Sequence, residues 1–228
     1  MDDIIALNTN AVDLMQRGFL QEAISCFREA HSTSGLLRGV GDDQEQGTDK
    51  VTRTFLPVRS VPLGHTTIPL LLQDQNTFSI FDRPLLIDIT NLTTAYSFAD
   101  QISLTAVILF NTGLASQLLG MQDLRSQQAR FKKAMKLYQL ASTTLNKSGV
   151  EGNCLVCLAL SNNMGHIHSH FCEGSETQGC LDCLQAGLRA LHSSNCRYKC
   201  DIHEDEWLLP FHLNVLVLHG QAAAAAAA

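Results

Sequence analysis

The stretch Gly18–Ala30, GFLQEAISCFREA, decides the fold of this chain. After the glycine, apolar residues recur every three or four positions, a spacing that places them on one face of a helix. They are Leu20, Ala23, Ile24, Phe27 and Ala30. An earlier stripe with the same spacing consists of Ile4, Leu7, Ala11 and Leu14. Because glycine readily ends a helix, residues 1–35 are predicted to form two helices that reverse direction at Gly18.

The same organisation recurs twice in residues 98–192. A long apolar helix is predicted from about residue 100 to residue 119, with a loop of about nine extra residues opening at Gly120. An amphipathic helix follows this loop, and its apolar face carries Phe131, Ala134, Leu137, Tyr138 and Ala141. The third pair is predicted over about residues 153–172 and 175–192, with Leu181, Leu184, Leu188 and Leu191 as its apolar stripe.

The segments outside these pairs lack a helical period. Residues 36–97 begin as a predicted loop and continue with TTIPLLLQ and TFSIFDRPLLIDI, two stretches rich in β-branched and aromatic residues that predict short strands. Residues 193–220 are predicted to be a C-terminal extension with a strand in FHLNVLVLHG, or alternatively a helix. Because an isolated two-stranded hairpin is marginal in water, we expect Leu213–Leu218 to pair with part of Phe78–Ile89. The alanine-rich tail 221–228 predicts no function.

Two of the helix pairs carry a specific resemblance. GFLQEAISCFREA resembles the second half of a tetratricopeptide repeat, with Ala23, Phe27 and Ala30 at its small-large-small positions. KAMKLYQLA repeats this spacing, and the glycines of FNTG and NNMG match the small position of the first helix. The chain thus resembles divergent tetratricopeptide-like proteins without assigned activity. This resemblance implies a mainly α fold of antiparallel helix hairpins in a right-handed superhelix, with a small inserted β element. An ordinary helical bundle is the alternative.

The resemblance also implies an adaptor or scaffold, because the first helices of such repeats line a groove that holds a peptide or a partner helix. The corresponding positions in the first two pairs are Ile5, Asn8, Thr9, Val12, Val107, Phe110, Asn111 and Leu114. The third pair is the most polar. The predicted partner-binding residues are Asn111, Asn162, Asn163, His166 and His170, with ordinary exposed polar residues as the alternative.

The stretch Cys154–Cys183 holds five cysteines and three histidines, the residue types that bind zinc. Its two CxxC pairs are expected to lie roughly 16 Å apart along a helix hairpin, too far to share one metal ion. Two ligand sets stay open: Cys154 and Cys157 with Cys196 and Cys200, or His168 with Cys172 and Cys180. A zinc-binding module over residues 154–200 is therefore the alternative function. We favour cysteines packed as small hydrophobes in the core, and no metal or cofactor.

The remaining function classes find little support. A net charge of −6 gives no general attraction to nucleic acid. No phosphate-binding glycine loop, G-x-S-x-G or H-E-x-x-H motif is present, so no enzyme is expected. A thiol-dependent enzyme is the third interpretation.

The expected location follows from the ends and the apolar runs. The first residues, MDDIIALN, do not resemble an export signal. The runs TAVILF and LNVLVL are six residues long, short of the ~20 that span a membrane. We expect a protein or peptide partner, without nucleic acid or membrane, in the cytoplasm or the nucleus.

Overall fold

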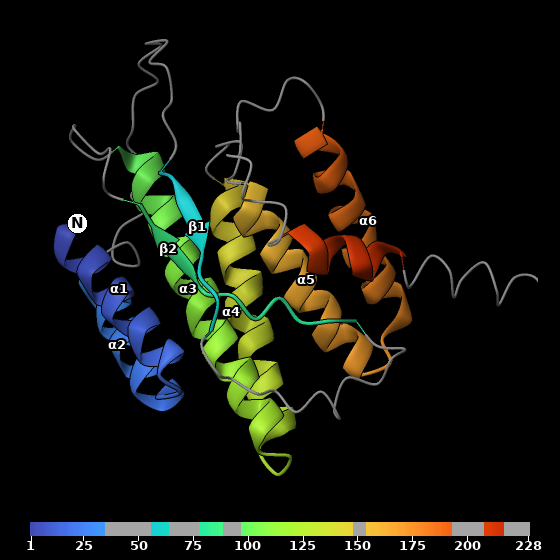
Figure 1. Ribbon diagram of the computed structural model, residues 1–228, viewed down its shortest axis with the longest axis horizontal. Coiled ribbons are helices and arrows are strands. Elements are labelled where there is room, and N and C mark those ends of the chain that lie inside the picture. Colours follow the sequence, from blue (N-terminus) through green and yellow to red (C-terminus); the bar gives the residue numbers. More distant parts are fainter. Residues whose placement is uncertain (35–55, 64–77, 89–96, 148–153, 193–207, 217–228) are drawn as a thin grey trace, which may run out of the picture.

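The computed structural model describes residues 1–34, 56–63, 78–88, 97–147, 154–192 and 208–216 (Figure 1). These residues form a mainly helical fold with a small two-stranded sheet. The helices are α1 Asp2–Gln16, α2 Leu20–Thr33, α3 Phe98–Gln122, α4 Gln127–Lys147, α5 Cys154–His170, α6 Gly174–His192 and a last helix over 208–216. Strand β1 Val58–Ser60 pairs antiparallel with β2 Leu85–Ile87.

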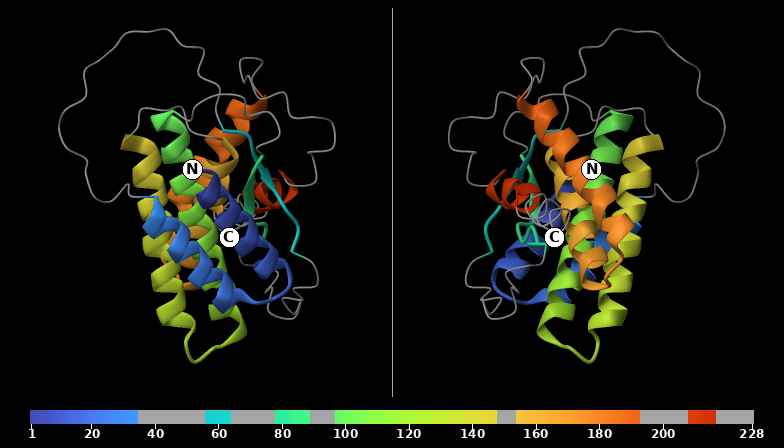
Figure 2. Two further views of the ribbon diagram at one scale, coloured as in Figure 1. Left: turned by 90° about the vertical axis from the view of Figure 1, so that its left-hand side faces the viewer. Right: turned by 90° about the vertical axis from the view of Figure 1, so that its right-hand side faces the viewer.

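The helices pack as three consecutive hairpins, as the sequence predicts. α1 packs on α2, α3 on α4, and α5 on α6. Gly18 lies in the first turn with φ +84°, a left-handed conformation that glycine adopts at little cost. The views in Figure 2 show the strands and the helix 208–216 on the same side of the helical array.

Helix α3 is the centre of the fold, in contact with α1, α2, α4, α5 and β2. Its first turn is closed by a capping box, in which Ser97 and Asp100 each accept a hydrogen bond from the backbone N–H of the other. By length and composition alone α3 could cross a membrane, with a mean hydropathy of 1.6. Because 94% of that stretch is buried inside the fold, its apolar character is accounted for by its central position. The absence of a membrane partner stays a prediction.

Two glycines of α3 let α4 approach closely. A Cβ on Gly113 would lie 2.5 Å from Cε1 of Tyr138, and a Cβ on Gly120 would lie 2.9 Å from Cδ1 of Phe131. The predicted loop at Gly120 is therefore wrong: α3 continues to Gln122, and only residues 123–126 connect it to α4. Close packing offsets the roughly 1 kcal/mol that glycine costs within a helix.

The predicted C-terminal strand is also wrong, because residues 208–216 are helical. The helix is apolar on both sides, with Phe211 buried and Leu209, Leu213 and Leu216 exposed. Apolar residues on two faces hide the helical period and leave an alternation typical of a strand. Residues 217 and 218 lie outside the described residues.

The inserted β element differs from its prediction in one strand. β2 lies in TFSIFDRPLLIDI as expected, but its partner β1 comes from residues 58–60, which were predicted to be a loop. TTIPLLLQ, at residues 66–73, lies outside the described part of the chain. Each strand has only three residues, so alternation could not reveal β1.

The close approach at Gly113 gives a stability test. Replacing Gly113 with alanine should lower the free energy of unfolding by about 1–3 kcal/mol, because the buried Tyr138 ring cannot retreat from the added methyl group. Gly179, inside α6, has no atom within 4 Å of a built Cβ. Its replacement with alanine should instead stabilise the protein by about 0.5–1 kcal/mol. Urea denaturation measures both, and equal effects would contradict the packing at Gly113.

Candidate functional site

Five buried asparagines surround the extended residues 78–88. We call them the asparagine cluster: Asn8 of α1, Asn111 of α3, Asn162 and Asn163 of α5, and Asn214 of the last helix. Each is at most 3% exposed. In Figure 1 the extended segment runs from β2 across the front of α4 and α5. Buried amides need hydrogen-bond partners, and the backbone of this segment supplies most of them.

The segment is bound through its backbone at Leu85. Asn111 accepts a hydrogen bond from the Leu85 N–H through Oδ1 at 2.8 Å and donates from Nδ2 to the Leu85 carbonyl, also at 2.8 Å. Asn8 donates to the same carbonyl at 3.3 Å and accepts from Asn111 Nδ2 at 3.0 Å. The two amides therefore support each other while they hold one residue of the segment.

The same two-point contact occurs at Phe81. Asn163 accepts from the Phe81 N–H through Oδ1 at 2.9 Å and donates from Nδ2 to the Phe81 carbonyl at 3.0 Å. A primary amide can satisfy both backbone groups of one extended residue, as a neighbouring strand would.

At Ser79 the last helix completes the set. Asn214 accepts from the Ser79 N–H at 2.7 Å and donates to its carbonyl at 2.8 Å. Asn162 donates to that carbonyl at 2.9 Å and accepts from Asn214 Nδ2 at 2.7 Å. Asn214 thus occupies the place in which a third strand was expected, and its side chain replaces strand pairing.

The side chains of the segment fill apolar spaces beside the asparagine cluster. Phe78 lies against Gly165, where a Cβ would be only 2.6 Å from the Phe78 Cζ. Phe81 stacks on Phe211, with 4.8 Å between the ring centroids, and lies 6.3 Å from the ring of Phe110. Phe78, Phe81 and Leu85 are each no more than 1% exposed.

A chain of hydrogen bonds extends from the asparagine cluster into the helical core. Asn163 Nδ2 donates to the Tyr138 hydroxyl at 3.3 Å, and this hydroxyl donates to Gln117 Oε1 at 2.7 Å. Burial raises the pKa of Tyr138, so the hydroxyl keeps its proton. Gln117 Nε2 then lies 2.9 Å from His166 Nδ1 and donates to it. His166 Nδ1 must therefore be unprotonated for the chain to be complete.

The structure separates the five predicted partner-binding residues into two groups. Asn111, Asn162 and Asn163 all contact the extended segment, whereas His166 and His170 have no hydrogen bond to it among the described residues. His166 ends the internal chain, and exposed His170 packs edge-on against Phe131 at 4.9 Å.

Sequence reasoning did not select four residues that belong to this site. Asn8 stood at a predicted groove position but in an otherwise apolar set, and Asn214 was placed on a strand. Gln117 and Tyr138 meet only after α3 and α4 pack. No sequence signal marks Asn214, because the apolar residues on both faces of the last helix hide its period.

The predicted burial of the cysteines is wrong for those that the structure describes. Cys157, Cys172 and Cys183 are exposed, and Cys26, Cys154 and Cys180 are partly exposed. Leucines and alanines fill the interface between α5 and α6 and leave the thiols at its edge. Partial loss of hydration raises the pKa of the Cys157 thiol, and the nearby Cys183 adds to this shift.

The zinc ligand sets are only partly described. Within the described ranges, no group of three or more histidine, cysteine, aspartate or glutamate side chains could hold a metal ion. His168, of the second set, pairs with Glu173. Cys196 and Cys200, of the first set, lie outside the described residues.

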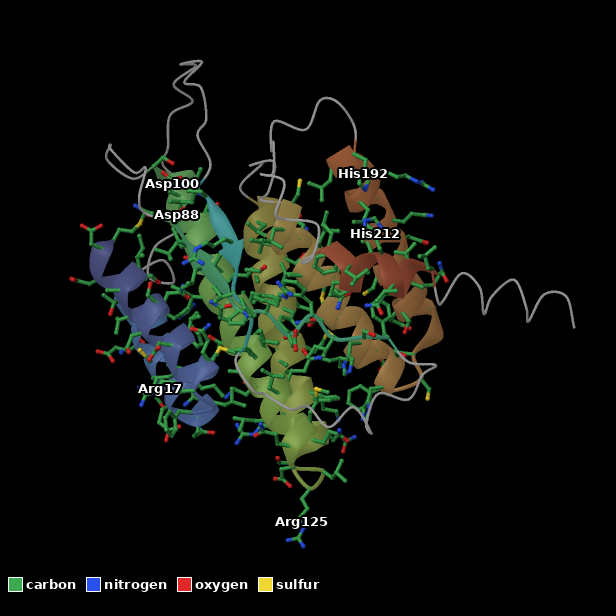
Figure 3. The ribbon with its side chains drawn as sticks, in the orientation of Figure 1. Arg17, Asp88, Asp100, Arg125, His192 and His212 are labelled. Atoms are coloured by element: carbon green, nitrogen blue, oxygen red, sulfur yellow. The ribbon has the colours of Figure 1, made fainter. Side chains whose placement is uncertain are left out.

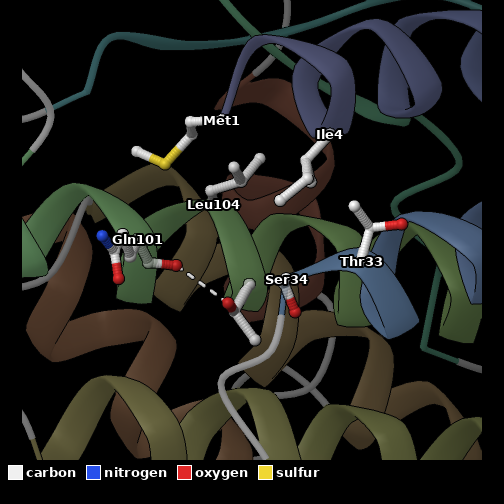
Figure 4. Close-up of a pocket in the computed structure, with 7 residues that line it drawn as sticks. Met1, Ile4, Thr33, Ser34, Gln101 and Leu104 are labelled. Carbon is white, nitrogen blue, oxygen red and sulfur yellow. Dashed lines mark hydrogen bonds between the residues drawn. The ribbon is translucent and has the colours of Figure 1, made fainter.

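Other surface features do not extend the site. An open pocket of about 220 Å³ lies between the start of α1, the end of α2 and the start of α3 (Figure 4). Its lining, which includes Met1, Ile4 and Leu104, holds no charged side chain. Figure 3 shows Arg17 and Arg125 at the periphery of the molecule. His192 and His212 lie side by side, with 5.7 Å between their ring centroids.

Comparison with protein-family models, with curated proteins and with solved structures finds no match for this chain.

Removing an amide of the asparagine cluster should destabilise the protein. Replacing Asn163 with alanine should lower the free energy of unfolding by about 2–4 kcal/mol, because it leaves the Phe81 N–H and carbonyl buried without partners. Asn10, also on a helix, is exposed and makes only a long 3.9 Å contact to Cys26. Its replacement with alanine should change stability by less than about 0.5 kcal/mol. A chemical denaturation series decides between these outcomes.

The internal chain should make stability depend on pH. Burial, together with nearby His170, lowers the pKa of His166 to about 4. The unfolded chain, with a histidine pKa of about 6.5, therefore binds more protons between pH 6.5 and pH 4, and stability falls as the pH is lowered through this window. The titration of His166 alone should lower the free energy of unfolding by about 2 kcal/mol when the pH falls from 7.5 to 5.

A matched variant isolates the contribution of His166. Asparagine at this position offers an oxygen near the place of Nδ1 but does not titrate. The His166→Asn protein should lose less free energy of unfolding on acidification than the wild type, by about 2 kcal/mol. Parallel pH profiles for the two proteins would show that His166 does not carry this dependence.

Proposed function

We propose that this protein is an interaction scaffold, or adaptor, of tetratricopeptide-like type, which holds an extended polypeptide in a groove lined by α1, α3 and α5. The observation that carries this proposal is the two-point binding of backbone groups by Asn111 and Asn163. Such contacts recognise extended backbone whatever side chains it carries. In the structure these asparagines bind the chain's own residues 78–88, which supports an extended polypeptide as the proposed ligand.

The right-handed superhelix of tetratricopeptide repeats is part of this proposal. Three helix hairpins pack in sequence. In the second one Gly113 lies at a close helix contact, and the small residues Ala134 and Ala141 are fully buried. Four of the five asparagines lie on the first helix of a hairpin, which is the side that lines the groove of such arrays: Asn8, Asn111, Asn162 and Asn163.

The alternative functions have less support among the described residues. A thiol-dependent enzyme needs a thiolate at neutral pH, whereas partial loss of hydration raises the pKa of Cys26, Cys157 and Cys180. A zinc module would require ligands that are not described. We therefore propose a protein or peptide partner, no catalysis, and no role for nucleic acid or a membrane, with action in the cytoplasm or the nucleus.

A chain with a weakened internal segment tests the scaffold proposal. In the opened variant, Phe78→Ala together with Phe81→Ala removes the two aromatic anchors but keeps all five asparagines. We expect it to retain extended peptides from a random eleven-residue library in a pull-down. A further Asn163→Ala substitution should reduce retention about tenfold or more, because two backbone hydrogen bonds are lost.

Folding is the control for this comparison. Far-ultraviolet circular dichroism and size-exclusion chromatography must show that both variants keep the helical fold. A folded opened variant that retains no library peptide would refute the scaffold function.

A further inference from the structure

The side chains of the chain's own residues 78–85 indicate which side chains a partner segment would need. Resting on the proposed function, we propose that the scaffold binds, in exchange for its residues 78–85, a partner segment with aromatic side chains at its first and fourth positions, an apolar side chain at its third and leucine at its eighth. Phe78, Ile80, Phe81 and Leu85 occupy these positions in the chain itself and are all buried.

The first position is selected by a missing side chain. Gly165 leaves the space in which the tip of the Phe78 ring lies, since a Cβ there would come within 2.6 Å of Cζ and 2.7 Å of Cε2. The nearest other atom is Cβ of Cys180, 3.1 Å from the same point. A flat ring fits this narrow space between α5 and α6. Gly165 is therefore a specificity-determining residue.

The fourth position is selected by aromatic contacts from two helices. The Phe81 ring stacks on Phe211 with an interplanar angle of 27° and is tilted by 49° to Phe110. Aromatic pairs with centroids 4.5–7 Å apart are worth about 0.5–1.5 kcal/mol beyond their buried area. An aliphatic residue would lose these contacts, so the site favours an aromatic ring.

The intervening positions are not selected in this way. Ser79, Asp82 and Arg83 are only partly buried. The Ser79 side chain makes no hydrogen bond that the described residues show, and the cluster binds its backbone instead. Burial also raises the pKa of the Asp82 carboxyl above its usual range, so its surroundings disfavour the charged form of this side chain. A partner can carry other residues at these positions.

Exchange is favoured by the way in which the segment is bound. Any buried segment must have its backbone N–H and C=O groups paired, and here side-chain amides pair them instead of a neighbouring strand. The asparagine cluster contacts backbone atoms that every extended polypeptide presents. Another segment with the same anchors would satisfy every amide that the internal one satisfies.

Peptide binding to the opened variant tests the pattern. The probe is a fluorescent peptide with the sequence of residues 77–88, followed by anisotropy. We expect saturable binding, and we expect the same peptide with alanine at the position of Phe78 or Phe81 to bind about tenfold or more weakly. A peptide with alanine at the position of Asp82 should bind within about threefold of the parent.

Gly165→Ala in the opened variant supplies the decisive comparison. The added methyl group should weaken binding of the parent peptide about 5- to 100-fold, because overpacking costs about 1–3 kcal/mol. The same substitution should weaken binding of the peptide with alanine at the first position by less than about threefold. Equal weakening of both peptides would refute the role of Gly165.

The outcomes separate this inference from the scaffold function. Binding of many peptides without preference for the aromatic positions refutes the pattern and leaves the scaffold proposal intact. Absence of all peptide binding refutes both. A concentration-dependent dimer of the wild-type chain would overturn the proposal in favour of exchange between two copies.

A gentler variant covers the case in which the opened variant does not fold. Ser79→Pro removes the N–H that Asn214 binds and keeps every buried side chain of the segment. This chain should bind the parent peptide more tightly than the wild type does. Equal binding by the two would show that the internal segment is not exchanged.

Discussion

The structure depends on one constraint: the backbone groups of an extended segment buried among helices must find hydrogen-bond partners. In the part of the chain that the structure describes, residues 78–88 have a single three-residue strand as their sheet partner. Asparagine side chains provide the remaining bonds, at Ser79, Phe81 and Leu85. Without them each buried group would cost about 1–3 kcal/mol, so the segment could not lie where it does.

This constraint explains features far from the segment. Asn163 is held by Tyr138, whose ring needs the space that Gly113 leaves in α3. Tyr138 is in turn bonded to Gln117, and Gln117 to His166. The polar core therefore joins the second and third hairpins through hydrogen bonds as well as apolar packing. Such networks stabilise a fold only when every member is paired, as these members are.

The same constraint is the basis of the function that we propose for the site. Five asparagines from four helices converge on one extended stretch. They are distant in the sequence and meet only through tertiary packing. Backbone recognition by the amides and side-chain recognition beside Gly165 and Phe211 are physically separate. A scaffold built in this way can hold different segments with common anchors, which is the behaviour that we propose for this protein.

The sequence by itself determined the helix hairpins, because α1, α2, α4 and α6 each bury one apolar face, which gives a 3.6-residue period, and α3 is apolar over most of its length. Through the tetratricopeptide resemblance it also placed Asn111, Asn162 and Asn163 at positions that line the groove of such repeats. Only the tertiary structure decided what these residues contact, since the segment lies about 80 residues from Asn163 in the chain. It also decided that residues 208–216 are helical, because a short helix with two apolar faces has no period to read. The cysteines likewise carry no sequence signal that distinguishes a buried site from an exposed one, and packing left the six that the structure describes exposed or partly exposed.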